Sequence, residues 1–228
     1  MKISILSLFP EMFIGPFGHS ILKRAKEKNA VTINIVNIRD FGIGKHKTVD
    51  DKPYGGGAGM VLRVDVIDKA VQSVRCNKEC QEQVILLDPQ GKPFIQTTAR
   101  KFSKKEHLIL VCGHYEGVDE RVRGLVDLEI SIGDYILTGG ELAAMVVTDA
   151  IVRLLPGVLG KKESEKIESF EKKLLEYPQY TRPQAYKNIS VPKELLLGNH
   201  KAIASWRDKQ ARARTKIRRP DLLRPSPS

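Results

Sequence analysis

The chain has 228 residues, of which 41% are hydrophobic, and it carries a net charge of +11 at pH 7. This length and composition suit one large folded domain, or one domain of about 150 residues with a smaller one beside it. No apolar run approaches the roughly 18 residues that cross a bilayer, and the short apolar N-terminus lacks a signal-peptide cleavage site, so membrane insertion and secretion are not expected.

The chain contains three cysteines, Cys76, Cys80 and Cys112, with no Cys-x-x-Cys pair and no His-rich cluster beside them. An odd number of thiols without zinc-finger spacing indicates neither a disulfide framework nor a structural zinc site. We therefore expect three ordinary thiols, no residues that form a metal site and a location in the reducing cytoplasm.

In chain order, apolar runs alternate with helical patterns. The pattern predicts strands at residues 3–8, 31–36, 83–88, 107–112 and 125–132, and helices at residues 12–28, 63–74 and 141–155, the first of them interrupted by Gly15, Pro16 and Gly18. Strands separated by helices predict an α/β fold with a parallel sheet. Residues 39–59 show no element signal, and a stretch of that length is typical of a functional loop or of disorder.

Three of the predicted strands lead into glycine-containing segments: LDPQG at residues 87–91, CGHYEGVDERV at 112–122 and SIGDYILTGGEL at 131–142. Ligands of parallel sheets bind at the carboxyl ends of strands, so these segments are expected to converge on one pocket. Gly133, Gly139 and Gly140 permit close approach of the main chain to a ligand, although an ordinary tight turn is the alternative. None of the segments matches a dinucleotide or triphosphate fingerprint.

Positive charge is concentrated in the last third of the chain. Residues 161–228 hold 17 Lys and Arg against 8 Asp and Glu, whereas residues 1–160 hold 21 against 19. A clustered positive field attracts polyanions, of which nucleic acid is the commonest, and Trp206 offers a stacking or core surface within it. A solvated helix surface is the alternative, but it fits dispersed charge better than this cluster.

These segments belong to a longer ordered set of motifs. The others are FPEMF at residues 9–13, TVDDKPYGGGAGM at 48–60, PGVLG at 156–160, YTRP at 180–183, and GNH followed by a Trp-Arg pair and RRPDLL. In this order, from end to end, the set resembles the bacterial tRNA (guanine-N1)-methyltransferase family.

The resemblance implies an enzyme that transfers a methyl group from S-adenosylmethionine to N1 of the guanosine immediately 3′ of the anticodon, which helps to maintain the reading frame. It implies a SPOUT-class parallel sheet with a deep trefoil knot, although general topology rules argue against knots. The implied division is a catalytic domain at 1–160, a flexible linker at 161–180 and a basic helical tRNA-binding domain at 181–228. The family forms homodimers whose active sites are shared between subunits. The resemblance also implies that Mg²⁺ assists the reaction.

The chemistry requires a base and a cation. Methylation at N1 of guanine removes the proton from that nitrogen, and the electron density that builds up on O6 needs a positive partner. The resemblance assigns Arg153 to O6 and a linker carboxylate to the proton. Where the family commonly has Asp in a D-S-F motif, this chain has Glu168, which keeps the carboxylate but adds one methylene. A helix-terminal surface arginine and an exposed linker glutamate are the alternatives.

The resemblance also implies two sets of binding residues. Tyr115 could instead be a core aromatic, and two smaller departures from the family pattern are His114 in place of arginine and Ala143 in place of proline. The expected substrate residues are Asp50, Tyr54, Gly55, Gly56, Gly57, Gly59, His200 and Arg207. The expected cosubstrate residues are Leu87, Pro89, Gly91, Gly113, Tyr115, Glu116, Ile132, Gly133, Asp134, Tyr135, Ile136, Leu137, Gly139 and Gly140.

Three other functions remain open from the sequence. A SPOUT methyltransferase acting on a ribose 2′-hydroxyl or on ribosomal RNA would share the pocket but not the TVDD and YTRP elements. A catalytically silent RNA-binding protein would fit the change to Glu168. A nicotinamide-dependent oxidoreductase would fit the parallel sheet, but the missing fingerprint and the basic tail weigh against it.

Overall fold

The computed structural model describes residues 1–76, 80–159 and 168–224. The chain divides into two compact units, Met1–Gly160 and Lys161–Ser228, and each is described by itself below. No helix within the described ranges is long and apolar enough to cross a membrane.

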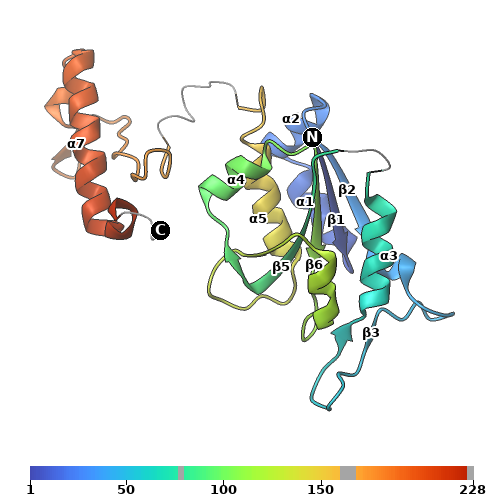
Figure 1. The fold of residues 1–228 in the computed structure, drawn as a ribbon. Coiled ribbons are helices and arrows are strands. Elements are labelled where there is room, and N and C mark those ends of the chain that lie inside the picture. Colours follow the sequence, from blue (N-terminus) through green and yellow to red (C-terminus); the bar gives the residue numbers. More distant parts are fainter. Residues whose placement is uncertain (77–79, 160–167, 225–228) are drawn as a thin grey trace. The chain divides into compact units, whose positions relative to one another are not determined.

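The first unit is built on one parallel sheet of five strands in the order β2-β1-β6-β5-β7 (Figure 1). The strands are β1 (Lys2–Ser7), β2 (Thr32–Asn37), β5 (Glu82–Pro93), β6 (His107–Cys112) and β7 (Leu128–Ser131). β1 pairs with the edge strand β2 on one side and with the central strand β6 on the other, so that Ile5 of β1 lies opposite Ile35 of β2 and Leu110 of β6. The predicted α/β fold with a parallel sheet is confirmed.

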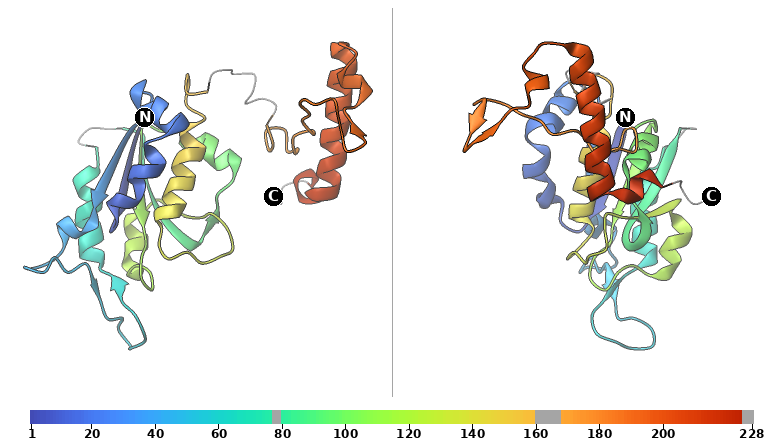
Figure 2. Two further views of the ribbon diagram at one scale, coloured as in Figure 1. Left: turned by 180° about the vertical axis from the view of Figure 1, so that it is seen from behind. Right: turned by 90° about the vertical axis from the view of Figure 1, so that its left-hand side faces the viewer.

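Helices cover both faces of this sheet (Figures 1 and 2). Alternate residues of β6 separate into two cores, with Leu108 and Leu110 on one face and Ile109 and Val111 on the other. The first core is closed by η1 (Pro10–Phe13), α1 (Ile14–Phe17), α2 (Ser20–Glu27), α4 (Gln96–Phe102) and α5 (Glu141–Val152), and the second by η2 (Ile38–Phe41), α3 (Val64–Val74) and η3 (Glu120–Leu125). Burial on both faces explains why the strands are continuous apolar runs in the sequence. Each such buried side chain contributes about 1.5–3 kcal/mol.

The interval 39–59, for which no element is predicted, contains short ordered structure. After η2, Ile43 and Thr48 exchange backbone hydrogen bonds of 2.9 and 3.0 Å. The two-residue strand β3 (Asp50–Asp51) then pairs antiparallel with β4 (Val61–Leu62). The prediction of an element-free stretch is wrong at these points, because local backbone hydrogen bonds hold the turns without any apolar period in the sequence.

Strand β5 extends beyond its predicted end at residue 88. It pairs with β7 through Leu87, leaves the register, and pairs again through Lys92, so that both residues lie opposite Ile130. Residues 88–91 therefore leave the ladder as an excursion at the carboxyl end of the sheet. This places the LDPQG segment beside the other two glycine-containing segments.

The second unit contains the hairpin of β8 (Ala185–Tyr186) and β9 (Ile189–Ser190), the turns η4 (Lys193–Leu195) and η5 (Pro220–Leu223), and the long helix α7 (His200–Arg218). Asn199 caps α7, because its side chain accepts a hydrogen bond from the backbone N–H of Ala202 at 3.1 Å. Residues before the hairpin pack on this helix: the N–H of Leu175 donates to Oγ1 of Thr215 at 2.8 Å, and Tyr177 is buried.

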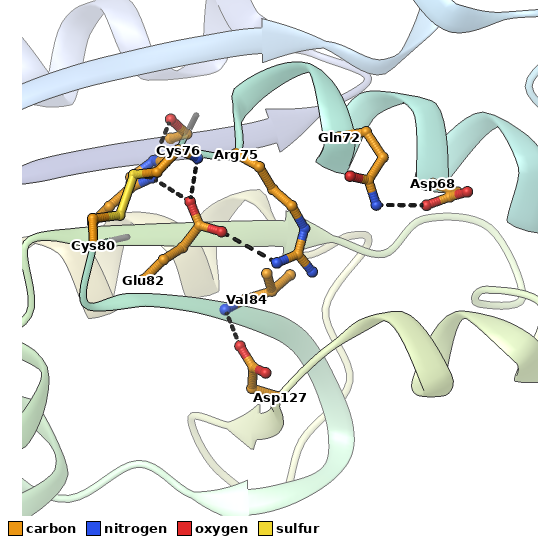
Figure 3. Close-up of polar contacts among 10 residues, drawn as sticks. Asp68, Gln72, Arg75, Cys76, Cys80, Glu82, Val84 and Asp127 are labelled. Carbon is orange, nitrogen blue, oxygen red and sulfur yellow. Dashed lines mark hydrogen bonds and ion pairs between the residues drawn. A yellow bond between two sulfur atoms is a disulfide. The ribbon is translucent and has the colours of Figure 1, made fainter. Parts of the chain in front are cut away.

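The expectation of three ordinary thiols is wrong. Cys76 and Cys80 form a disulfide with a Cα–Cα distance of 6.5 Å, within the usual range for such bonds (Figure 3). Cys112 is a buried free thiol. Cys76 follows the end of α3 and Cys80 precedes the start of β5. The fold brings the end of α3 close to the start of β5, and the count and spacing of cysteines do not reveal this proximity.

Candidate functional site

A cavity of about 310 Å³ lies at the carboxyl end of the sheet. Its walls come from the excursion after Leu87, the segment after Cys112, the segment after Ser131 and the first turn of α5. The three glycine-containing segments therefore converge, as expected for strand ends of a parallel sheet.

Most of the residues expected at a cosubstrate site line this cavity; Gly91 and Asp134 do not. The lining residues that were expected are Leu87, Pro89, Gly113, Tyr115, Glu116, Ile132, Gly133, Tyr135, Ile136, Leu137, Gly139 and Gly140. Sequence reasoning missed several neighbours of these residues in the same segments, and their adjacency is the signal that could have found them. The missed lining residues are Asp88, Gln90, His114, Gly117, Val118, Ile130, Ser131, Thr138 and Ala143.

Two glycines shape the cavity by close backbone packing. A Cβ on Gly91 would lie 2.4 Å from the backbone nitrogen of Ile130, so this glycine lets β5 rejoin β7 instead of facing the cavity. A Cβ on Gly140 would lie 2.7 Å from Cα of Cys112, and the N–H of Gly140 donates to the carbonyl of Gly113 at 2.8 Å. Gly140 therefore fixes the start of α5 directly against the end of β6.

A buried carboxylate, Glu141, lies between the cavity-lining residues Gly140 and Ala143 in the first turn of α5. The hydroxyl of Ser7 donates to its Oε1 at 2.8 Å, and its Oε2 lies 3.9 Å from Nδ1 of His114. Within the described part of the chain, that ring nitrogen has no hydrogen-bond partner. Burial, and secondarily the charge of Glu141, raises the pKa of the Cys112 thiol well above its ordinary value, so Cys112 is an uncharged packing residue.

Tyr115 and Glu116 form one rim of the cavity. Tyr115 has a positive φ of 59° and is exposed, so the interpretation as a core aromatic is wrong. Nη2 of Arg39 donates to its hydroxyl at 3.5 Å. The N–H of Glu116 donates to the carbonyl of Met60 at 3.1 Å, which ties this rim to the loop at residues 54–59.

That loop carries the expected substrate residues of the first unit except Asp50, which lies before the loop in β3. Tyr54 is fully exposed, while Asp50 is half-buried in β3. The loop glycines, Gly55, Gly56, Gly57 and Gly59, all have positive φ, a conformation that L side chains rarely adopt. The loop is thus built from backbone conformations that require glycine, with one large aromatic side chain presented to solvent.

Ion pairs hold the base of this loop. Arg63 pairs with Asp51 at 3.3 Å and with Asp65 at 2.9 Å. Hydrogen bonding to Arg63 lowers the pKa of Asp65, and hydrogen bonding to Arg121 lowers the pKa of Asp119 to about 2. These charges line an open hollow of about 950 Å³ beside Tyr54. Both carboxylates remain ionised at neutral pH.

In the second unit, Arg207 and Glu168 line the same groove of about 270 Å³ on α7. The guanidinium of Arg207 lies 4.7 Å from the ring centroid of Tyr177, a cation–π distance. His200 is exposed in the first turn of α7, and Trp206 lies with Tyr180 in a separate hollow of about 420 Å³. Arg207 therefore has a packing role in this unit besides any contact with a ligand.

Arg153 and Glu168 are expected to act together, but Arg153 belongs to the first unit and Glu168 to the second. Arg153 is the C-cap residue of α5 and keeps right-handed helical φ and ψ. It continues the exposed stripe of that helix formed by Leu142, Val146 and Asp149, because these positions recur at helical spacing. The expected cation thus lies at the end of a partly apolar exposed stripe.

Comparison with known proteins finds a family model and relatives that match nearly the whole chain. The family model described as tRNA (Guanine-1)-methyltransferase TrmD matches residues 1–225. A protein named tRNA (guanine-N(1)-)-methyltransferase from Carboxydothermus hydrogenoformans is 59% identical over 225 residues, which cover 98% of this chain and 88% of that protein. Proteins of the same name from Syntrophomonas wolfei and Bacillus cereus are 56% and 57% identical, over 98% of this chain and 90% and 92% of their own lengths.

Proposed function

The chain belongs to the tRNA (guanine-1)-methyltransferase family, and from this membership we propose that it transfers a methyl group from S-adenosylmethionine to N1 of the guanosine immediately 3′ of the anticodon in tRNA. The observation that carries the proposal is the convergence of three strand-end segments on one cavity, in a chain that matches the family over residues 1–225. The product helps to maintain the reading frame, and the enzyme works in the cytoplasm, where its tRNA substrate is found.

The cavity suits the proposed cosubstrate. Its volume of about 310 Å³ falls within the range of small-molecule sites. Leu87, Ile132 and Leu137 offer apolar surface for the adenine ring, while the glycine-rich backbone offers N–H and C=O groups for its polar edge. Glu116 at the rim offers a carboxylate to the positively charged methionine end. When bound, the cosubstrate supplies an electrophilic sulfonium methyl group.

Glu168 acts as the base in this proposal and Arg153 as the cation. The carboxylate of Glu168 accepts the N1 proton of guanine, and N1 forms its new bond to the methyl carbon as the carbon–sulfur bond breaks. The guanidinium of Arg153 holds the negative charge that develops on O6. A positioned base contributes roughly 10² to 10⁴ in rate, and a positioned charge partner roughly 10² to 10³.

The substrate residues follow from the loop geometry. The half-buried carboxylate of Asp50 accepts from the N–H edge of guanine, and the glycine loop with Tyr54 closes on the base. In the second unit, the basic face of α7 contacts the tRNA backbone, with His200 at its start. Arg207 joins this surface from its position on the ring of Tyr177.

We further propose a homodimer in which each active site combines the first unit of one subunit with the second unit of its partner. The exposed stripe of Leu142 and Val146 on α5 supports this, because it leaves apolar surface uncovered beside exposed Met12 and Ile14, and α5 contacts η1. Arg153 lies on the same stripe, so a dimer contact there brings the second subunit to the proposed cation. The SPOUT-class trefoil knot belongs to the same proposal.

Mg²⁺ is proposed only as an assisting ion. Within the described residues, the group that could hold a metal is Cys76, Cys80 and Glu82, and thiol ligands do not suit Mg²⁺, which takes oxygen ligands. Any Mg²⁺ would therefore be held mainly by phosphate and water.

The proposal is tested by methyl transfer from labelled S-adenosylmethionine to two unmodified tRNA transcripts that differ only in the nucleotide 3′ of the anticodon, guanosine in one and adenosine in the other. We expect one methyl group per guanosine transcript, located at N1 by nucleoside analysis, and none in the adenosine transcript. Equal methylation of both transcripts, or a methyl group on ribose, would overturn the assignment.

A further inference from the structure

A second cluster of reactive side chains lies at the end of the sheet opposite to the cavity, where the strands begin. Cys76 follows α3, and Cys80 lies shortly before Glu82, the first residue of β5 (Figure 3). His107 is the first residue of β6. Glu82 and His107 are direct partners in the register of β5 and β6. Since both strands begin here, these side chains gather at the amino-terminal end of the sheet, whereas the cavity lies at its carboxyl end.

Short contacts connect the members of this cluster. Oε2 of Glu82 lies 2.8 Å from Nδ1 of His107 and accepts from the backbone N–H of Cys76 at 2.9 Å. Sγ of Cys76 lies 3.6 Å from the same Nδ1. The two sulfurs and a Glu82 oxygen all lie within 4.8 Å of one another. Arg75 holds the other oxygen of Glu82 at 3.2 Å, which keeps the carboxylate turned toward the sulfurs.

We propose that reduction of the Cys76–Cys80 disulfide opens a metal site of the zinc class, with Cys76, Cys80, Glu82 and His107 as its four ligands. Thiolate, imidazole and carboxylate are the ligand types that Zn²⁺ takes, whereas Mg²⁺ and Ca²⁺ prefer all-oxygen sites. Four protein ligands leave no open position, so the site is structural.

The geometry already holds one edge of the required tetrahedron. With Zn–S of about 2.3 Å and Zn–N of about 2.0–2.1 Å, a sulfur and a nitrogen on one tetrahedral ion lie about 3.5 Å apart. Sγ of Cys76 and Nδ1 of His107 lie 3.6 Å apart. Two changes remain. The two sulfurs must separate, which breaking the bond between them permits, and His107 must move closer to Cys80, since it is not among the residues whose ligand atoms all lie within 4.8 Å of one another.

The chemical steps balance with an external dithiol or phosphine as reductant. The sulfur–sulfur bond accepts two electrons from the reductant and two protons, giving the thiols of Cys76 and Cys80. A dithiol reductant becomes its own disulfide, and a phosphine becomes its oxide by taking oxygen from water. Metal binding then releases the two thiol protons to solvent, while His107 stays neutral because its one proton passes from Nδ1 to Nε2.

Ser4 is the positioning residue for His107. Its buried hydroxyl lies 2.9 Å from Nε2 of the ring. A hydroxyl both donates and accepts, so it donates to Nε2 while Nδ1 is protonated and accepts from Nε2–H once Nδ1 binds the metal. The ring therefore keeps its orientation in both states.

The test uses the full chain, reduced with a phosphine and titrated with Co²⁺ as a spectroscopic probe, followed by Zn²⁺. We expect one equivalent of Co²⁺ to bind with thiolate-to-cobalt charge transfer and the intense visible bands of a tetrahedral ion, and Zn²⁺ to displace it. The unreduced chain is expected to show neither signal. Because no methyl transfer is measured, the result is independent of the proposed function.

Variants assign the ligands. Cys76→Ser and Cys80→Ser should each remove most of the charge-transfer band, whereas the matched control Cys112→Ala should keep the full spectrum. Ser4→Ala should keep the spectrum and weaken Zn²⁺ binding about 10- to 100-fold. The proposal is overturned if the reduced wild type binds no Co²⁺, if the oxidised chain binds it equally well, or if Cys112→Ala alone removes the signal.

Discussion

At the scale of single residues, the contact between Ser7 and Glu141 joins the end of β1 to the first turn of α5. The Ser7 hydroxyl donates to the buried carboxylate and accepts from the N–H of Phe9 at 2.9 Å. Ser7→Ala leaves both groups without this partner, which costs about 1–3 kcal/mol of stability. Urea unfolding measures the loss. Ser103→Ala, which removes a half-exposed hydroxyl from the carbonyl of Arg100, is the control and should change stability far less.

Asp119 predicts a pH dependence. Its side chain accepts from the backbone N–H and the guanidinium of Arg121, which lowers its pKa from 3.8 to about 2. A lowered carboxylate pKa stabilises the fold above the unfolded value, and that contribution is lost as the pH falls through the folded value. Asp119→Asn can still accept from the backbone but lacks the charge.

We therefore expect Asp119→Asn to be less stable than wild type at neutral pH, and this difference to shrink as the pH falls from about 4 toward about 2. Urea unfolding of both proteins across this range measures it. A difference that stays constant with pH would mean that the ionised carboxylate makes no contribution.

At the scale of elements, the exposed stripe on α5 carries the dimer proposal. Val146→Glu places a carboxylate where a subunit contact would bury it without a partner, which costs several kcal/mol, and each step of about 1.4 kcal/mol is tenfold in affinity. We expect self-association to weaken about 100-fold or more, measured by light scattering over a concentration series. Ile95→Glu, at another exposed apolar position, should leave the mass unchanged. A wild type that is monomeric would contradict the proposal directly.

The elements also show where sequence reasoning succeeds and where it stops. The strand at residues 107–112 was predicted correctly. All six of its residues are buried, so that burial on both faces of the sheet leaves a continuous, mainly apolar run in the sequence. Helix α4 was not predicted, because its seven residues span too little sequence for a clear helical period. The β8–β9 hairpin was also missed: its turn uses Lys187 and Asn188, both at positive φ, where glycine would have been the stronger signal.

The candidate site divides in the same way. The cavity residues could be predicted because three consecutive strand ends each carry their own motif, and the topology of a parallel sheet brings such ends together. The disulfide and its neighbours could not, because Glu82 and His107 meet Cys76 only through the register of β5 and β6. Likewise, Arg153 and Glu168 lie in different units, and no spacing in the chain relates them.

At the scale of the whole molecule, the two units differ in net charge. The positive charge of the second unit predicts that tRNA affinity falls as the salt concentration rises. Neutralising a phosphate-contacting lysine on α7 removes one released counterion, so Lys201→Gln and Lys209→Gln should each reduce the slope of log affinity against log salt by about 0.7–0.9. Filter binding over a salt series measures this slope. Lys69→Gln on α3 is the control. An equal reduction in the control would show that the field is not specific to α7.

The measurement that most directly tests the account is single-turnover methyl transfer to the guanosine transcript by wild type, Glu168→Gln, Glu168→Asp and Arg153→Ala. We predict that Glu168→Gln lowers the rate roughly 10²- to 10⁴-fold and Arg153→Ala roughly 10²- to 10³-fold, while Glu168→Asp retains most activity because it keeps the carboxylate. Cosubstrate binding should be unchanged in the Glu168 variants, because in this proposal Glu168 acts on the guanine and not on the cosubstrate. A Glu168→Gln enzyme with the wild-type rate would place the base elsewhere and contradict the central claim.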